Sequence, residues 1–213
     1  MRIVLCAATE FEISPILDFI KKQQFPDINV VFTGVGLTAA TYHITKAIYK
    51  HNPQIILQAG VAGSFNANNE GQVVVVKSEC LGDLGVEEKG TFHSVFTMGL
   101  QQADDYPWSN SKLVNTDKNL PEWGLPVVDA VTVHEISTDP KRIQYYRDQL
   151  QASIETMEGA ALHYVSLMEK FPFLQLRSVS NFAGERDKSK WQLKLAIEKL
   201  NYELEKILLK LMK

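Results

Sequence analysis

Two polar side chains in the last third of the chain stand where a predicted strand gives way to a helix or loop. Glu158 ends the segment Ser153–Glu158, and Asn181 follows the apolar run Leu174–Val179. In a parallel α/β sheet, polar residues at the carboxyl ends of strands converge on a ligand site. A lone carboxylate and a lone amide there indicate recognition of a neutral, hydroxyl-rich, heterocyclic ligand.

Two further carboxylates, Glu10 and Glu12, follow the first apolar run. Both could simply favour a helix N-terminus through the helix dipole, and that interpretation suits Glu10 well. Glu12 lies two residues further on, so the two side chains point in different directions and Glu12 could face inward over the strand ends. A carboxylate in that place could act as a general base on water.

Two glycine-rich turns are predicted after apolar runs. Gly34–Ala39 matches the G-x-G-x-x-A dinucleotide fingerprint, which also needs an acidic residue about 20 positions on to hold a ribose. No acidic residue occurs between positions 28 and 69, so we interpret this segment as a tight strand-to-helix turn. The second, Ala59–Phe65, is either a loop that needs positive φ or a place where backbone amides approach ligand or water.

The sequence lacks the residues that several other kinds of chemistry need. Cys6 and Cys80 are the only cysteines and form no Cys-x-x-Cys pair, and the five histidines have no metal-binding spacing. Neither a disulfide nor a zinc site is expected. The chain contains no Gly-x-Ser-x-Gly elbow for acyl transfer and no P-loop for phosphoryl transfer. We therefore expect no metal and no cofactor.

The elements that must position these residues alternate between strands and helices. Near-continuous apolar runs predict strands covered on both faces, at Ile3–Leu5, Ile28–Phe32, Ile55–Leu57, Val73–Val76, Val127–Val133 and Leu174–Val179. Helices are predicted over Phe11–Lys22, Leu37–Tyr49, from Asp139-Pro140, over Gly159–Lys170 and over Trp191–Met212. This order predicts an α/β fold, a three-layer αβα sandwich around a central mixed, mostly parallel sheet.

The composition bounds the remaining possibilities. At 213 residues with 45% hydrophobic and 22% charged residues, the chain is predicted to form a single domain over residues 1–213. The stretch Cys80–Trp123 has little periodicity and is expected to form long loops with one or two extra strands. A net charge of −3 argues against a nucleic-acid partner. The apolar start is too short for a signal peptide or a membrane span, which predicts a cytoplasmic protein with no membrane partner.

With these residues in view, the chain resembles the nucleoside phosphorylase/nucleosidase superfamily, and within it the futalosine hydrolases of menaquinone biosynthesis. The resemblance covers nearly the whole chain and is clearest at Ala7–Glu12, Gly34–Ala40, Ala59–Phe65 and Met157–Ala161 with Arg177–Trp191. It implies a nucleoside phosphorylase-like fold, a small-molecule nucleoside substrate and a homo-oligomer, a dimer or larger.

The resemblance also implies roles for single residues. In that family a Met-Glu turn holds the ribose, so Glu158 is expected to bind its hydroxyls and Met157 to pack against the sugar. An N-terminal glutamate binds the attacking water in related adenine nucleosidases, and it matches Glu12. Backbone groups at Gly63 and around Val133 are expected to complete the substrate contacts.

The base is expected near Ser180-Asn181, where the adenine-specific relatives have Ser-Asp. A carboxylate facing O6 of a 6-oxopurine would place two acceptors opposite each other, whereas the Asn181 amide can donate to O6 or N7 of hypoxanthine.

A phosphorylase usually binds its phosphate with arginines near the first strands and central turns, and none lies between Arg2 and Arg142. We therefore predict a hydrolase, with Glu12 and Asn181 catalytic, that converts futalosine to hypoxanthine and dehypoxanthine futalosine.

Three alternatives stay open: a methylthioadenosine/S-adenosylhomocysteine nucleosidase, a purine nucleoside phosphorylase, and a nucleoside-binding protein without catalysis. The sequence also leaves open what fills the 5′ pocket, for which Leu81–Phe96 or a neighbouring subunit could supply the lining. An amide cannot deliver a proton, so the group that protonates the leaving base is likewise open.

Overall fold

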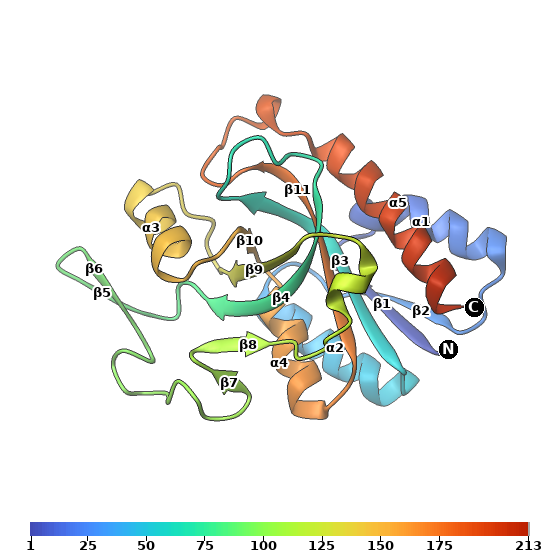
Figure 1. Cartoon of the computed structure of the whole chain (residues 1–213), viewed down its shortest axis with the longest axis horizontal. Coiled ribbons are helices and arrows are strands. Elements are labelled where there is room, and N and C mark those ends of the chain that lie inside the picture. Colours follow the sequence, from blue (N-terminus) through green and yellow to red (C-terminus); the bar gives the residue numbers. More distant parts are fainter. Residues whose placement is uncertain (213) are drawn as a thin grey trace.

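A computed structural model describes residues 1–212, and a nine-stranded sheet forms the centre of this part of the chain (Figure 1). Its strands are β1 (Ile3–Ala7), β2 (Ile28–Phe32), β3 (Ile55–Ser64), β4 (Val73–Leu81), β7 (Trp108–Ser109), β8 (Lys112–Val114), β9 (Val127–Thr132), β10 (Ile154–Thr156) and β11 (Phe173–Phe182). The strand order is β2-β1-β3-β10-β9-β4-β8-β7, and β11 pairs with both β3 and β4.

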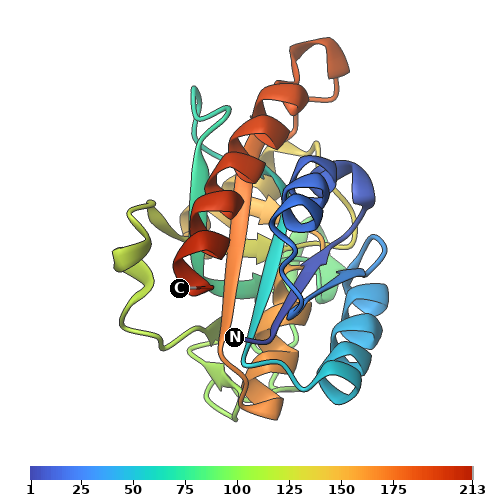
Figure 2. The same cartoon turned by 90° about the vertical axis from the view of Figure 1, so that its right-hand side faces the viewer.

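The sheet is mixed, as predicted. β1 pairs in parallel with β2 and β3, β11 with β3, and β9 with β4 and β10. The pairs β10–β3, β11–β4, β4–β8 and β7–β8 are antiparallel. The long strands β3 and β11 run side by side through the middle of the molecule (Figure 2).

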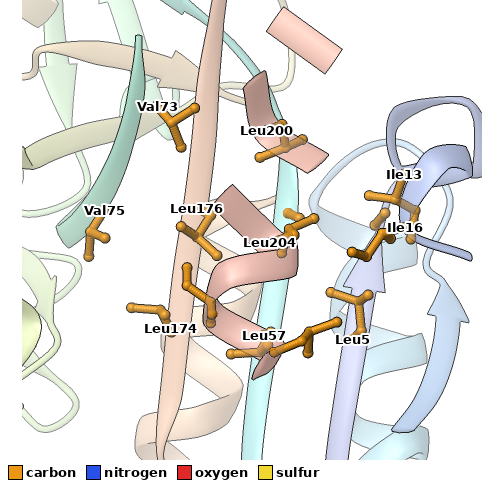
Figure 3. Packing of buried hydrophobic residues seen from close by; sticks show 14 of the residues in the cluster. Leu5, Ile13, Ile16, Leu57, Val73, Val75, Leu174, Leu176, Leu200 and Leu204 are labelled. Carbon is orange, nitrogen blue, oxygen red and sulfur yellow. The ribbon is translucent and has the colours of Figure 1, made fainter. Parts of the chain in front are cut away.

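Helices cover both faces of the sheet. They are α1 (Glu10–Gln23), α2 (Leu37–His51), α3 (Pro140–Gln144), α4 (Gly159–Glu169) and α5 (Leu193–Leu211), with short turns at Leu120–Trp123, Tyr145–Gln149 and Lys188–Lys190. Residues of α1 and α5 pack on one face, where Ile13 and Leu204 meet Leu5, Leu57 and Leu176 (Figure 3). Residues of α2 and α4 pack on the other face. The three-layer prediction is confirmed.

The segment Ala59–Phe65 is not the turn that the sequence predicts. β3 continues through it to Ser64, since β11 pairs with Gly60 and Gly63 while β10 pairs with Gly63 and Ser64. Backbone partners on both sides therefore keep these glycines extended. In contrast, the tight turn predicted at Gly34–Ala39 is confirmed, because Gly34 and Gly36 have φ of 77° and 90° just before α2.

The region Cys80–Trp123 contains more strands than the sequence predicts. In addition to the short strands β7 and β8, the segments β5 (Gly85–Glu88) and β6 (Thr91–Ser94) form a separate antiparallel hairpin. This hairpin extends away from the central sheet (Figure 1). The two strands pair only with each other and not with the core, so their sequence has neither the apolar run nor the periodicity that predicts a core strand. No helix within residues 1–212 is long and apolar enough to cross a membrane.

Candidate active site

A cavity of about 300 Å³ lies at the ends of β1, β3, β10 and β11. Side chains or backbone from widely separated parts of the chain line it. Among the residues predicted from the sequence, it brings together Glu12, Gly63, Met157, Glu158, Ser180 and Asn181. The sheet topology thus gathers six of the seven predicted site residues at one place.

Val133 is the predicted residue that the structure does not bring to the cavity. Its side chain is fully buried in a separate apolar cluster with Phe65 and Tyr146. Its backbone N–H donates to Thr156 O at 3.0 Å and is therefore already paired. Three residues further along the chain, Ile136 lines the cavity. The contact between substrate and the backbone around Val133 stays a prediction.

Glu12 is held at the start of α1 with one oxygen in a helix cap. Thr9 N donates to Glu12 Oε2 at 3.1 Å as part of a capping box, and Thr9 Oγ1 donates to the same oxygen at 3.2 Å. The other oxygen, Oε1, accepts from Val61 N on β3 at 3.1 Å. With 8% of its surface exposed, Glu12 reaches over the strand ends as the sequence predicted, and its orientation is determined by three donors.

Glu158 stands immediately before α4 and contacts two other predicted segments. Its Oε1 accepts from Gly36 N at 2.9 Å, so the glycine turn before α2 is part of this site. Its Oε2 lies 3.5 Å from Nη1 of Arg177, which is buried on β11. Arg177 Nη2 donates to Gln58 Oε1 at 2.9 Å. A buried cation therefore supports the carboxylate that was predicted to bind ribose.

Gly60 allows Glu12 and Arg177 to approach the same point over β3. A Cβ atom at Gly60 would lie 3.0 Å from Glu12 Oε1 and would clash with Arg177 Nη1. Glu12 Oε1 and the Arg177 guanidinium thus meet over Gly60, and Arg177 connects this point to the carboxylate of Glu158. Arg177 and Gly60 are not among the site residues predicted from the sequence. The available signal was an arginine inside an apolar strand, where a charge needs a partner.

Ser180 and Asn181 line the cavity together because β11 is irregular there. The register with β3 shifts between Val179 and Asn181, a β-bulge that turns neighbouring side chains toward one side. Ser180 Oγ donates to Asn181 Oδ1 at 2.7 Å. Asn181 Nδ2 donates to Phe182 O at 2.9 Å, and since an amide nitrogen carries two hydrogens, one stays free for a ligand.

Glu155 on β10 also lines the cavity, and it is not among the site residues predicted from the sequence. Only 5% of its surface is exposed, and burial raises its pKa to about 7 while the Arg186 charge opposes that rise. No spacing rule marks this residue, because it lies within the predicted strand. Its position becomes informative only once the sheet register is known.

The fold and this cavity define the class of protein: an α/β sandwich with a carboxylate-rich site at the ends of its central strands. Within that class, the chain belongs to the Phosphorylase superfamily, since the sequence model of this family matches residues 12–212.

Relatives with described activities support this assignment. The chain is 27% identical to a futalosine hydrolase of Thermus thermophilus over 83% of this chain and 79% of that protein. It is also 27% identical to a 5'-methylthioadenosine/S-adenosylhomocysteine nucleosidase of Tolumonas auensis, over 82% and 77% of the two chains. A Campylobacter jejuni aminodeoxyfutalosine nucleosidase is 23% identical over 87% and 88%.

Solved structures share the fold. The crystal structure of a Helicobacter pylori 5'-methylthioadenosine/S-adenosylhomocysteine nucleosidase with butyl-thio-DADMe-Immucillin-A superimposes with a TM-score of 0.79, at 18% identity and over 98% and 97% of the two chains. A futalosine hydrolase of the same organism gives a TM-score of 0.73, at 17% identity over 96% and 97%.

Proposed function

We propose that the protein is a purine nucleosidase, which hydrolyses the N-glycosidic bond between a purine and its ribose. The observation that carries this proposal is the position of Glu12, whose Oε1 lies over β3 beside the buried Glu158–Arg177 pair. A carboxylate held in this way can orient and deprotonate a water molecule. The nucleosidase names of the relatives point to the same chemistry.

In this mechanism the two carboxylates have separate tasks. Glu158 Oε1 keeps acceptor capacity beyond its bond to Gly36 N and binds the ribose hydroxyls, while Met157 packs against the sugar. As the bond from C1′ to the purine lengthens, positive charge develops on the sugar, which nearby carboxylates stabilise. Water held by Glu12 then attacks C1′, and Glu12 takes its proton.

The charges at the site favour water over phosphate as the attacking group. The carboxylates Glu12 and Glu158 lie next to the buried Arg177, whereas the second arginine at the cavity, Arg186, acts on Glu155. The guanidinium is already shared between Glu158 Oε2 and Gln58 Oε1. A phosphate dianion placed beside Glu12 and Glu158 would therefore meet two like charges that Arg177 is not free to offset. Release of free base at equal rates with and without added phosphate is the expected result; strict phosphate dependence would instead identify a phosphorylase.

For the substrate itself, we propose futalosine, from which hypoxanthine would be released. The free N–H of Asn181 is suited to O6 or N7 of a 6-oxopurine, and a futalosine hydrolase is among the relatives. The test is incubation with futalosine, inosine and methylthioadenosine, followed by identification of the released base. Hypoxanthine from futalosine at the highest kcat/KM supports the proposal, and preferential adenine release contradicts it.

A methylthioadenosine/S-adenosylhomocysteine nucleosidase is the second candidate. The Tolumonas auensis relative is as similar in sequence as the futalosine hydrolase, which favours this candidate. Asn181, where such enzymes have an aspartate, weighs against it. In the same assay this candidate predicts adenine released from methylthioadenosine and little turnover of futalosine.

We further propose that the chain forms a homo-oligomer. Apolar side chains are exposed between β4 and β8, and such surfaces commonly mark protein interfaces; they are Leu84, Val86, Met98, Leu100 and Tyr106. Sedimentation equilibrium should give a dimer or larger species, whereas a monomer at micromolar concentration would contradict this proposal.

A further inference from the structure

Glu155 occupies a defined position in the sheet beside the predicted base site. It pairs across the sheet with Gly63 of β3, and Gly63 pairs in turn with Asn181 of β11. Side chains at paired positions project from the same face of a sheet. Because Gly63 has no side chain, Glu155 and Asn181 flank an open position, and all three residues line the same cavity.

The carboxyl group of Glu155 lies over Gly63. Its Oε1 is 3.1 Å from the place that a Cβ atom on Gly63 would occupy. Its Oε2 is buried and has no hydrogen-bond partner among residues 1–212. A buried, ionised carboxylate without a partner is unfavourable, so the site favours either a protonated carboxyl group or a bound donor or acceptor.

The groups that face Glu155 make its protonation sensitive to pH near neutrality. Arg186, from the loop after β11, favours the ionised form, but burial outweighs it and raises the pKa to about 7. Tyr146, from the turn after α3, is another titratable neighbour, and burial raises its own pKa well above the ordinary value of a tyrosine. Glu12 and Glu158 line the same cavity and disfavour a further negative charge there.

We propose that Glu155 is the general acid that protonates the departing purine. The proposal rests on the proposed nucleosidase function and supplies the proton that the Asn181 amide cannot deliver. As the bond between C1′ and the purine nitrogen breaks, its electron pair moves into the purine, and a ring nitrogen takes the proton from the Glu155 carboxyl group. Water adds to C1′ and gives a proton to Glu12, and exchange with solvent then removes that proton from Glu12 and returns Glu155 to its protonated form.

The test compares Glu155→Gln with the wild type on two substrates as a function of pH. One substrate is inosine or futalosine, and the other is 4-nitrophenyl riboside, whose leaving group departs without a proton. We expect the variant to lose about 100-fold in kcat/KM on the purine nucleoside, at the lower end of general-acid effects. Turnover of the nitrophenyl riboside should stay within about twofold. The decline of purine turnover above pH about 7 in the wild type should disappear.

Two controls separate this role from a structural one. Glu88→Gln removes an exposed carboxylate on β5 and should match the wild type on both substrates. Glu79→Gln removes another buried carboxylate whose pKa is raised to about 7, but which does not line the cavity. It should leave the decline above pH 7 in place.

The role of Glu155 would be overturned if Glu155→Gln kept its purine turnover or lost activity equally on both substrates. It would also be overturned if the decline of purine turnover above pH about 7 disappeared in Glu79→Gln instead of in Glu155→Gln. The proposed function fails separately, if the wild-type protein hydrolyses no purine nucleoside at all.

Discussion

Glu158 Oε2 and Arg177 Nη1 lie 3.5 Å apart, and both side chains are almost completely buried. The two residues come from different elements, the turn before α4 and the middle of β11. Burial makes each charge dependent on the other, because neither can be solvated by bulk water. This pair therefore links the stability of the sheet to the charge of the proposed active site.

Replacing Glu158 with alanine should weaken both activity and stability. The ribose loses its predicted acceptor, so KM should rise and kcat should fall. Arg177 would stay buried without its partner, which typically lowers the free energy of unfolding by about 3 to 5 kcal/mol. Urea unfolding and steady-state kinetics measure the two effects. Adding Arg177→Met should restore part of the stability but none of the activity, and a stable, active single variant would contradict this account.

Glu12→Gln should abolish hydrolysis while nucleoside binding stays nearly intact. A glutamine can still accept a hydrogen bond in the helix cap, but it cannot take a proton from water. We expect kcat to fall by about 100-fold or more. Glu10→Gln is the matched control, since Glu10 is exposed in the same helical turn. Wild-type turnover in Glu12→Gln would remove this residue from the mechanism.

Gly60→Ala should impair catalysis through the positions of its neighbours. The new Cβ would clash with Arg177 Nη1 and crowd Glu12 Oε1, so at least one of the two must move. A displacement of about 1 Å can lower a rate by about 100-fold. The kcat value should fall at temperatures where the variant is still folded, as judged by its thermal midpoint of unfolding. Full activity would mean that Arg177 and Glu12 need not meet at this point.

Asn181→Asp should shift base preference from hypoxanthine toward adenine. A carboxylate can accept from the adenine amino group but opposes the carbonyl of a 6-oxopurine. The measurement is the ratio of kcat/KM for inosine to that for methylthioadenosine in the wild type and the variant. Asn181→Ala, which lacks either polar group, should lower both values. Continued preference for inosine in Asn181→Asp would contradict the assignment of the base site.

Glu79 should make stability depend on pH. Burial raises its pKa from an ordinary 4.5 to about 7, despite hydrogen bonds from Gln175, Thr132 and Thr156. Between these values the folded protein holds a proton that the unfolded chain has lost, so stability decreases as pH rises, by up to about 1.4 kcal/mol per pH unit.

Glu79→Gln should remove this contribution. Relative to the wild type, the variant should therefore gain stability from pH 4.5 to about 7 and show a constant difference above that. Urea unfolding at several pH values measures the difference. Other buried groups that titrate, such as His163, are present in both proteins, so their contributions cancel in the difference between the two free energies of unfolding. A difference that does not change with pH would contradict the raised pKa.

The sequence alone predicted the elements and most of the cavity. Apolar runs and helical periodicity are local properties, so the strands around Ile3, Ile55 and Leu174 and the helix from Gly159 could be located without coordinates. Polar residues at strand ends could also be recognised, because parallel strands deliver their carboxyl ends to the same edge. Glu12, Glu158 and Asn181 were found in this way, and the structure brings them to one cavity.

Only the tertiary structure decided which residues meet inside that cavity. Arg177 and Glu155 lie within strands, and their importance depends on register: Gly60 opposite Arg177, and Gly63 opposite both Glu155 and Asn181. Register is set by long-range strand pairing and by packing against the helices, which no local pattern encodes. The sequence therefore determined the kinds of group available at the site, whereas the pairing of β3 with β10 and β11 decided which charges are buried beside which glycine.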